Sequence, residues 1–137
     1  MPTTPPVQSR IENTFAGLIG LNFSESSVGS SVCSLEVKQN LLNANGVLHG
    51  GVTYSLADTG MGAALYSLLE DGQSCATAEI KIAYFRPVTS GTLTCETKVI
   101  HKGKKLAFLE SEVKAGEQLI AKAMGTYSIF NLNGTKK

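Results

Sequence analysis

Tryptophan is absent from this 137-residue sequence, and aromatic residues together make up only 7% of it. Charge of one sign is scarce as well, because 12 lysines and arginines against 11 aspartates and glutamates leave a formal net charge of +1. A near-neutral chain has no overall field to attract nucleic acid or an anionic membrane, and this one has few rings to stack on bases. We therefore expect neither nucleic acid nor membrane among its partners.

Long hydrophobic runs are missing too. The longest uncharged run, residues 39–57 with histidine taken as neutral, is interrupted by asparagines, a histidine and three glycines, so it does not predict a membrane span. The first ten residues, MPTTPPVQSR, lack the basic-then-apolar order of a secretory signal. The length fits one domain, and residues 1–8 and the polar tail 131–137 are expected to be its flexible ends.

Cysteine is rare, and Cys33, Cys75 and Cys95 are widely spaced with no CxxC pair. An odd number of scattered cysteines argues against a disulfide framework and against a structural zinc site. We expect three buried or half-buried thiols in a reducing cytoplasm, and no bound metal.

The most informative stretch that is present runs from Asn43 to Leu69. It opens with turn residues, and its apolar remainder predicts a helix from near Gly50 to near Glu70, where Asp71-Gly72 forms a stop signal. Because this helix is apolar on most sides, we expect it to be buried. Gly60 and Gly62 each cost about 1 kcal/mol of helix propensity relative to alanine, which close approach of a sheet laid across the helix would explain.

The rest of the chain reads mainly as strands. Residues 9–19 predict one short helix, because apolar residues recur at helical spacing (Ile11, Phe15, Leu18 and Ile19). Alternation of apolar and polar residues predicts strands near 21–24 and at 28–39, 77–86, 92–101, 106–114 and 119–130. One long helix followed by an antiparallel meander predicts an α+β domain in which one face of the sheet packs on the helix.

The tripeptide His49-Gly50-Gly51 lies where the long helix should begin. Free backbone N–H groups there coincide with the positive end of the helix dipole, and glycine lets a ligand approach closely. Such a site polarises a carbonyl and stabilises an oxyanion. The alternative is a tight turn into the helix with a hydrogen-bonded histidine.

Asp58 is a carboxylate in the middle of a mostly apolar helix, a costly placement unless it is paired, solvated or used. It suits a general base or a nucleophile, although an exposed or hydrogen-bonded aspartate without chemistry is an equal alternative. Eight residues separate it from Gly50, about 12 Å along one helix. An antiparallel helix from a second subunit would bring its Asp58 beside Gly50, which predicts two sites in a two-fold dimer.

Other polar residues are weaker candidates. Asn43 suits a turn and also a hydrogen bond near His49, whereas Thr77 and Glu79 are placed on the strand face opposite Ile80. A basic set suits phosphate contacts, or simply solvent: Arg86, Lys102, Lys104 and Lys105, with Gly103 in the turn. The Walker A, GxGxxG, HExxH and nucleophile-elbow patterns do not occur.

The ordered set Asn43-x-x-Gly46-x-x-His49-Gly50-Gly51, followed by Asp58, resembles the hotdog-fold acyl-CoA thioesterases, most closely their PaaI-like (phenylacetic acid degradation) branch. Two later segments belong to the same resemblance, Tyr84-Phe85-Arg86-Pro87 and His101-Lys102-Gly103-Lys104. The similarity extends from about Phe15 to Phe130.

The resemblance implies a sheet wrapped around one helix, dimers with a continuous sheet, and often tetramers built from two dimers. It implies hydrolysis of an acyl-CoA, with an aryl or medium-chain acyl group, to a free acid and CoA. No metal or redox cofactor is then needed, and CoA is part of the substrate. The Gly50 N–H would polarise the thioester carbonyl, and Asp58 of the partner subunit would act as nucleophile or as base for water.

The remaining implied roles concern orientation and binding. Asn43 and His49 would orient water, substrate or one another, and Thr77 would stand where relatives have a serine that positions water. Substrate contacts would come from Gly51 beside the oxyanion donor and, near the CoA phosphates, from Arg86 and the turn Lys102-Gly103-Lys104-Lys105.

Two other functions remain open. A hotdog hydratase or dehydratase would use a histidine with an acid for proton transfer at carbon, and the His49-to-Asp58 spacing speaks against it. A non-catalytic acyl-CoA-binding sensor is the other, although no appended pair of DNA-binding helices is visible.

Overall fold

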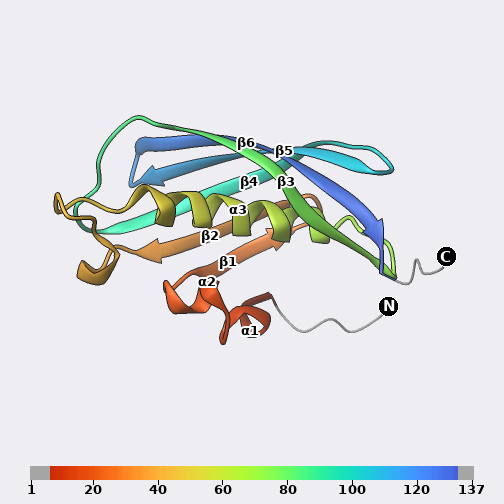
Figure 1. The fold of residues 1–137 in the computed structure, drawn as a ribbon, viewed down its shortest axis with the longest axis horizontal. Coiled ribbons are helices and arrows are strands. Elements are labelled where there is room, and N and C mark those ends of the chain that lie inside the picture. Colours follow the sequence, from red (N-terminus) through yellow and green to blue (C-terminus); the bar gives the residue numbers. More distant parts are fainter. Residues whose placement is uncertain (1–6, 133–137) are drawn as a thin grey trace.

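Helix α3 (Gly50–Tyr66) lies along the inner face of an antiparallel sheet that curves around it in this computed structural model, which describes residues 7–132 (Figure 1). The sheet has six strands in the order β1-β2-β4-β5-β6-β3. Their bounds are β1 Asn22–Ser27, β2 Ser30–Glu36, β3 Gln73–Tyr84, β4 Thr92–Lys102, β5 Leu106–Ala115 and β6 Gln118–Asn131. The expected α+β class, with one face of the sheet packed on the helix, is confirmed.

The core lies between α3 and the sheet. Residues on one side of the helix are buried, namely Val52, Thr53, Leu56, Ala57, Gly60, Met61, Ala64 and Leu65. They pack in two apolar clusters against inward side chains of the strands, such as Leu35 and Leu93 near the start of α3 and Leu109 and Ile129 near its end. The opposite side, which includes Ser55, Asp58 and Gly62, is partly exposed in a single chain. The prediction of a buried helix therefore holds for one face.

The two helix glycines differ in their surroundings. A Cβ added at Gly60 would lie 2.9 Å from the hydroxyl oxygen of Thr97 on β4, so the sheet does approach the helix closely there. A Cβ added at Gly62 would meet nothing within 4 Å, so the same explanation is wrong for Gly62. Helix α3 also ends earlier than expected, at Tyr66. The Ser67 hydroxyl donates to the carbonyl of Ala64 at 2.7 Å and accepts from the N–H of Gly29, which ties the helix end to the β1–β2 turn.

The N-terminal segment forms two short helices, α1 (Val7–Ile11) and α2 (Phe15–Leu18), rather than the single helix predicted over residues 9–19. Thr14 ends the first of them, because both its N–H and its hydroxyl donate to the carbonyl of Ile11. Phe15 and Leu18, expected on a core-facing stripe, are 60% and 80% exposed.

Two residues of the expected flexible ends make hydrogen bonds with the rest of the chain. The side-chain oxygen of Gln8 accepts a hydrogen bond at 2.8 Å from the N–H of Phe23 on β1, and the N–H of Leu132 donates to the carbonyl oxygen of Gly72 at 2.8 Å. The rest of those two segments, residues 1–6 and 133–137, lies outside the described residues.

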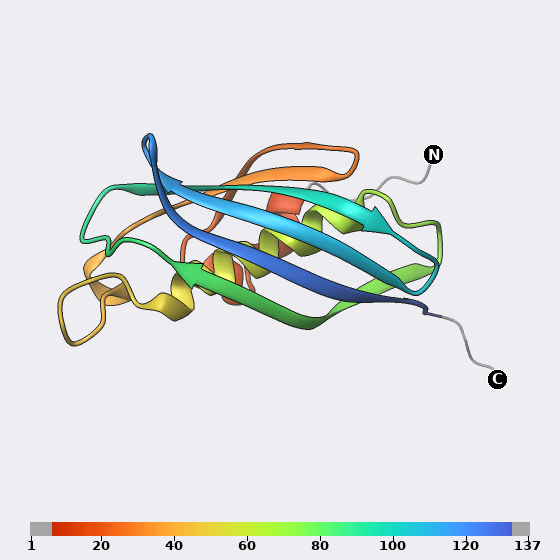
Figure 2. The same cartoon turned by 90° about the horizontal axis from the view of Figure 1, so that it is seen from above.

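The long connection between β2 and α3 includes the 3-10 turn η1 (Gln39–Leu41). Viewed from above, α3 runs beneath the strands of the sheet (Figure 2). Strand β3 follows α3 and pairs with β6, so it lies at one edge of the sheet. Within residues 7–132, no helix combines the length and apolar character needed to cross a bilayer.

Candidate active site

His49 caps the N-terminus of α3. Its Nδ1 accepts a hydrogen bond from the N–H of Gly51 at 2.8 Å, so in the neutral ring the proton resides on Nε2. The N–H of Gly50, the first residue of the helix, has no hydrogen-bond partner within residues 7–132. The structure thus contains both features weighed from the sequence, a hydrogen-bonded histidine and an unused donor beside it.

Tyr84 covers the other side of Gly50. Its hydroxyl donates to the carbonyl of Gly50 at 2.6 Å, and a Cβ added at Gly50 would lie 3.2 Å from the tyrosine ring. Partial burial, and then the neighbouring Tyr54, raise the pKa of the Tyr84 hydroxyl, so it stays a donor at neutral pH. Gly50 and Tyr84 line a surface hollow together with Leu48, Thr53, Phe85, Arg86, Pro87, Val88 and Ile120. Arg86, expected at a phosphate, therefore lies in the same hollow as Gly50.

Asn43 organises its own loop. Its side-chain oxygen accepts from the N–H of Asn45 at 2.9 Å and from the N–H of Val47 at 3.3 Å. This is the turn geometry that the alternative interpretation predicted. Among the described residues, no hydrogen bond joins the side chains of Asn43 and His49.

Asp58, midway along α3, is held by two hydroxyl groups from the sheet. Thr77 on β3 donates to its Oδ1 at 2.7 Å, and Tyr127 on β6 donates to the same oxygen at 2.5 Å. The Tyr127 hydroxyl is also 2.7 Å from the backbone carbonyl oxygen of Asp58. The aspartate is therefore anchored rather than merely solvated.

The placement of Thr77 corrects a prediction. A β-bulge between Thr77 and Glu79 shifts the alternation of β3 by one residue, so Thr77 shares the inner face with Ile80 instead of lying opposite it. Glu79 does face outward, where it accepts from Thr126 at 3.4 Å. The bulge thus brings Thr77 to Asp58.

Two groups near Asp58, the Tyr127 phenol and the Cys75 thiol, keep their protons at neutral pH. Burial, and then the hydrogen bond to Asp58, raise the pKa of the Tyr127 phenol. Burial, and then the charge of Asp58, raise the pKa of the Cys75 thiol. Both groups stay protonated at neutral pH, which leaves the carboxylate as the charged group of this cluster. Within the described residues, no three histidine, cysteine or acidic side chains gather in an arrangement that suits a metal ion.

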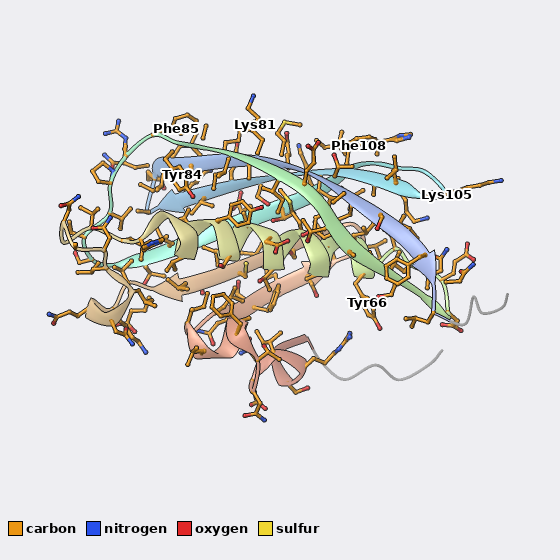
Figure 3. All side chains as sticks on the ribbon, in the orientation of Figure 1. Tyr66, Lys81, Tyr84, Phe85, Lys105 and Phe108 are labelled. Atoms are coloured by element: carbon orange, nitrogen blue, oxygen red, sulfur yellow. The ribbon has the colours of Figure 1, made fainter. Side chains whose placement is uncertain are left out.

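The predicted site residues fall into three separate places in one chain. Gly50, His49 and Arg86 are at the start of α3, whereas Asp58 and Thr77 are about 12 Å further along the helix, as eight residues require. The basic turn Lys102–Lys105 connects β4 to β5, and the N–H of Gly103 donates there to the carbonyl oxygen of Leu106. Figure 3 shows Lys105 at the end of the molecule opposite Tyr84 and Phe85.

Sequence reasoning missed two residues that contact the site, Tyr84 and Tyr127. Both lie on the faces of β3 and β6 that the alternation of apolar and polar residues assigns to the apolar side. A signal was present for Tyr127, because it is the only residue with a polar side chain among the inward positions of β6 (Ala121, Ala123, Gly125, Tyr127 and Ile129). A buried hydroxyl needs a partner, and its partner is Asp58.

An antiparallel sheet wrapped around one long helix is the hotdog fold. The Thioesterase superfamily model matches residues 45–122. A protein of Saccharolobus solfataricus is 34% identical over 115 residues, which cover 82% of this chain and 75% of the relative. The acyl-coenzyme A thioesterase PaaI of Escherichia coli is 30% identical over 104 residues, covering 75% and 72%.

A solved structure agrees with these matches. A conserved protein from Pseudomonas aeruginosa superposes with a TM-score of 0.86 at 33% identity, covering 91% of this chain and all of that one. The chain belongs to the thioesterase superfamily, and the predicted class of enzyme, a thioester hydrolase, is confirmed.

Proposed function

We propose that this chain hydrolyses aryl- or medium-chain acyl-CoA thioesters to a free acid and CoA, at a site shared between two subunits. The observation that carries the proposal is the anchored carboxylate of Asp58 on the central helix of a thioesterase-superfamily chain. Its second oxygen, Oδ2, has no hydrogen-bond partner within residues 7–132. A charged, oriented oxygen suits attack on a thioester, directly or through water that it deprotonates.

The oxyanion donor in this proposal is the N–H of Gly50. It is the unused first amide of α3, at the positive end of the helix dipole. Negative charge develops on the thioester oxygen as the carbonyl is attacked, and a fixed donor aimed at that oxygen lowers the barrier. His49 and Gly51, already bonded to each other, hold the turn, and Asn43 stabilises the loop that leads into it.

A second subunit is required because one helix keeps its Gly50 and Asp58 too far apart for a single carbonyl. The partly exposed face of α3 and the free edge of β3 are two surfaces on which a second copy can pack. An antiparallel helix pair under a sheet continued through β3 would place Gly50 of each subunit near the other's Asp58. The dimer then contains two equal sites, and two such dimers would form the tetramer that the family resemblance implies.

The cations have a consistent place in this arrangement. Arg86 lines the hollow at Gly50, while Lys105, in the turn that also contains Lys104 and follows Lys102, lies at the far end of the same chain. A two-fold axis that reverses one helix against the other brings the basic turn of one subunit to the same end as Arg86 of the other. Together they would offer positive charge to the CoA phosphates. Three free thiols fit a reducing cytoplasm as the compartment.

The test is thiol release from a panel of aryl- and alkyl-CoA thioesters, with the wild type beside Asp58→Asn. The amide keeps the volume of the side chain and an oxygen that accepts from Thr77 and Tyr127, but it loses the charge. We expect a loss of turnover of at least about 10³-fold, as for other essential bases and nucleophiles, with the oligomer intact and the acyl groups ranked by the wild type.

Two results would overturn the proposal. Undiminished turnover in Asp58→Asn would remove the carboxylate from the mechanism. No wild-type turnover of any thioester would favour a hydratase, tested with a 3-hydroxyacyl-CoA, or a module that binds acyl-CoA without reaction.

A further inference from the structure

Tyr127 is a buried side chain whose one polar atom is directed at Asp58. Only 2% of the residue is exposed, and its hydroxyl lies 2.5 Å from Oδ1. Thr77 donates to that same oxygen, whereas Oδ2 has no partner within residues 7–132. The two oxygens of one carboxylate are therefore in unequal surroundings.

We propose that Tyr127 is a positioning residue which, together with Thr77, occupies Oδ1 of Asp58 so that Oδ2 is the oxygen presented to the thioester or to the attacking water. The inference rests on the proposed thioester hydrolysis, because it assigns a role within that site.

Local geometry supports this assignment. Thr77 and Tyr127 are directly paired across β3 and β6, so the two donors are fixed side by side by the register of the sheet. The terminal torsion of an aspartate is broad and poorly defined on its own. Two donors on one oxygen select a single orientation of the carboxylate plane, and hydrogen bonds to a charged acceptor are among the stronger ones.

The donor is available at every pH at which such an enzyme would work. Burial, and then the hydrogen bond to Asp58, raise the pKa of the Tyr127 phenol, so deprotonation does not remove it near neutrality. Tyr127 would thus keep the orientation of Asp58 fixed across that range of pH.

The competing explanation is purely structural. Tyr127 belongs to the core cluster under α3, and its hydroxyl also lies 2.7 Å from the backbone carbonyl oxygen of Asp58. Removing that hydroxyl would then weaken the fold without a particular effect on the chemistry. A useful experiment has to separate these two effects.

The variant is Tyr127→Phe, which keeps the ring and loses the donor. We expect kcat to fall about tenfold, the rate equivalent of about 1.4 kcal/mol, with KM nearly unchanged because the buried hydroxyl touches no substrate. Thr77→Val should lower kcat in the same way, again with KM nearly unchanged.

Ser31→Ala is the matched control. Ser31 is 1% exposed, and its hydroxyl donates to the carbonyl of Gly60 on α3 at 2.7 Å, but it does not touch Asp58. This variant loses a buried hydroxyl bonded to the same helix, so it reports the structural effect alone. We expect lower stability with kcat and KM unchanged. Equal losses of kcat in both variants, or none in Tyr127→Phe, would overturn the inference.

Carboxyl ¹³C NMR at neutral pH separates this inference from the proposed function, because it needs no turnover. The Asp58 signal is assigned by its disappearance in Asp58→Asn. Its chemical shift should change in Tyr127→Phe and stay the same in Ser31→Ala. An unchanged chemical shift in Tyr127→Phe defeats the inference whatever the substrate, whereas a changed one without hydrolysis of any thioester supports the contact with Asp58 and defeats the proposed function.

Discussion

Gly50 is a residue at which the proposed chemistry and the packing of the chain meet. It supplies the first N–H of α3, and its lack of a side chain leaves room for Tyr84, whose hydroxyl bonds its carbonyl. A side chain at this position would crowd Tyr84, and a proline would also remove the N–H donor. The two effects can be separated, because the backbone of His49 suits either alanine or proline after it.

Gly50→Pro and Gly50→Ala form a matched pair. Proline is well tolerated at the first position of a helix, and His49 before it has the extended backbone that a following proline prefers, with φ −62° and ψ 131°. Both variants add a Cβ against Tyr84, but only proline removes the N–H. We expect thioester hydrolysis to fall about 10²–10³-fold in the proline variant and much less in the alanine variant, measured by thiol release. Equal losses would indicate crowding at Tyr84 rather than a lost donor.

Among the elements, α3 has one face pressed on the sheet and one face open, and its two glycines report this difference. Gly60→Ala would place a Cβ 2.9 Å from the Thr97 hydroxyl oxygen, so we expect it to destabilise the fold by about 1–3 kcal/mol. Gly62→Ala meets no atom of its own chain within 4 Å, so within one subunit it should stabilise the helix by up to about 1 kcal/mol. Urea unfolding of both variants measures the difference, and the opposite order would contradict the packing described for α3.

The elements with a clear period were predictable from the sequence. Alternation located the strands of the sheet, and the apolar run between His49 and Asp71 located the central helix. The break between α1 and α2 was not predictable, because the helical spacing of apolar residues gives no indication that Thr14 ends the first helix. The end of α3 was missed for a similar reason, since Ser67 is held by Gly29, which is distant in sequence.

The site was predictable in part. His49, Gly50 and Asp58 stand out in the sequence as a turn and a charge in apolar surroundings. The partners of Asp58 do not, because the bulge in β3 adds one residue without a compositional mark and reverses the face of Thr77. Tyr127 could be placed on the inner face of β6, but its contact with Asp58 depends on a register between strands that only the folded chain contains.

At the scale of the whole molecule, the proposed sharing of each site between two subunits leads to a prediction about mixtures. Asp58→Asn and Gly50→Pro should each be inactive as pure dimers. In a co-expressed dimer of one subunit of each kind, one site carries both defects and the other carries none. Random pairing of equal amounts should therefore restore about a quarter of the wild-type activity. Thiol release by the mixed protein measures this, with each parent protein as control, and a mixture no more active than its parents would contradict the shared site.

Strand β3 lies at the edge of the sheet, with β6 as its neighbour among the described residues, and it also carries Thr77. Edge strands open more readily than central ones, because fewer ladder hydrogen bonds hold them. Opening of β3 in a single chain would release one of the two donors on Asp58. In the proposed dimer the sheet continues through β3, so the partner strand that fastens this edge would also hold Thr77 against Asp58.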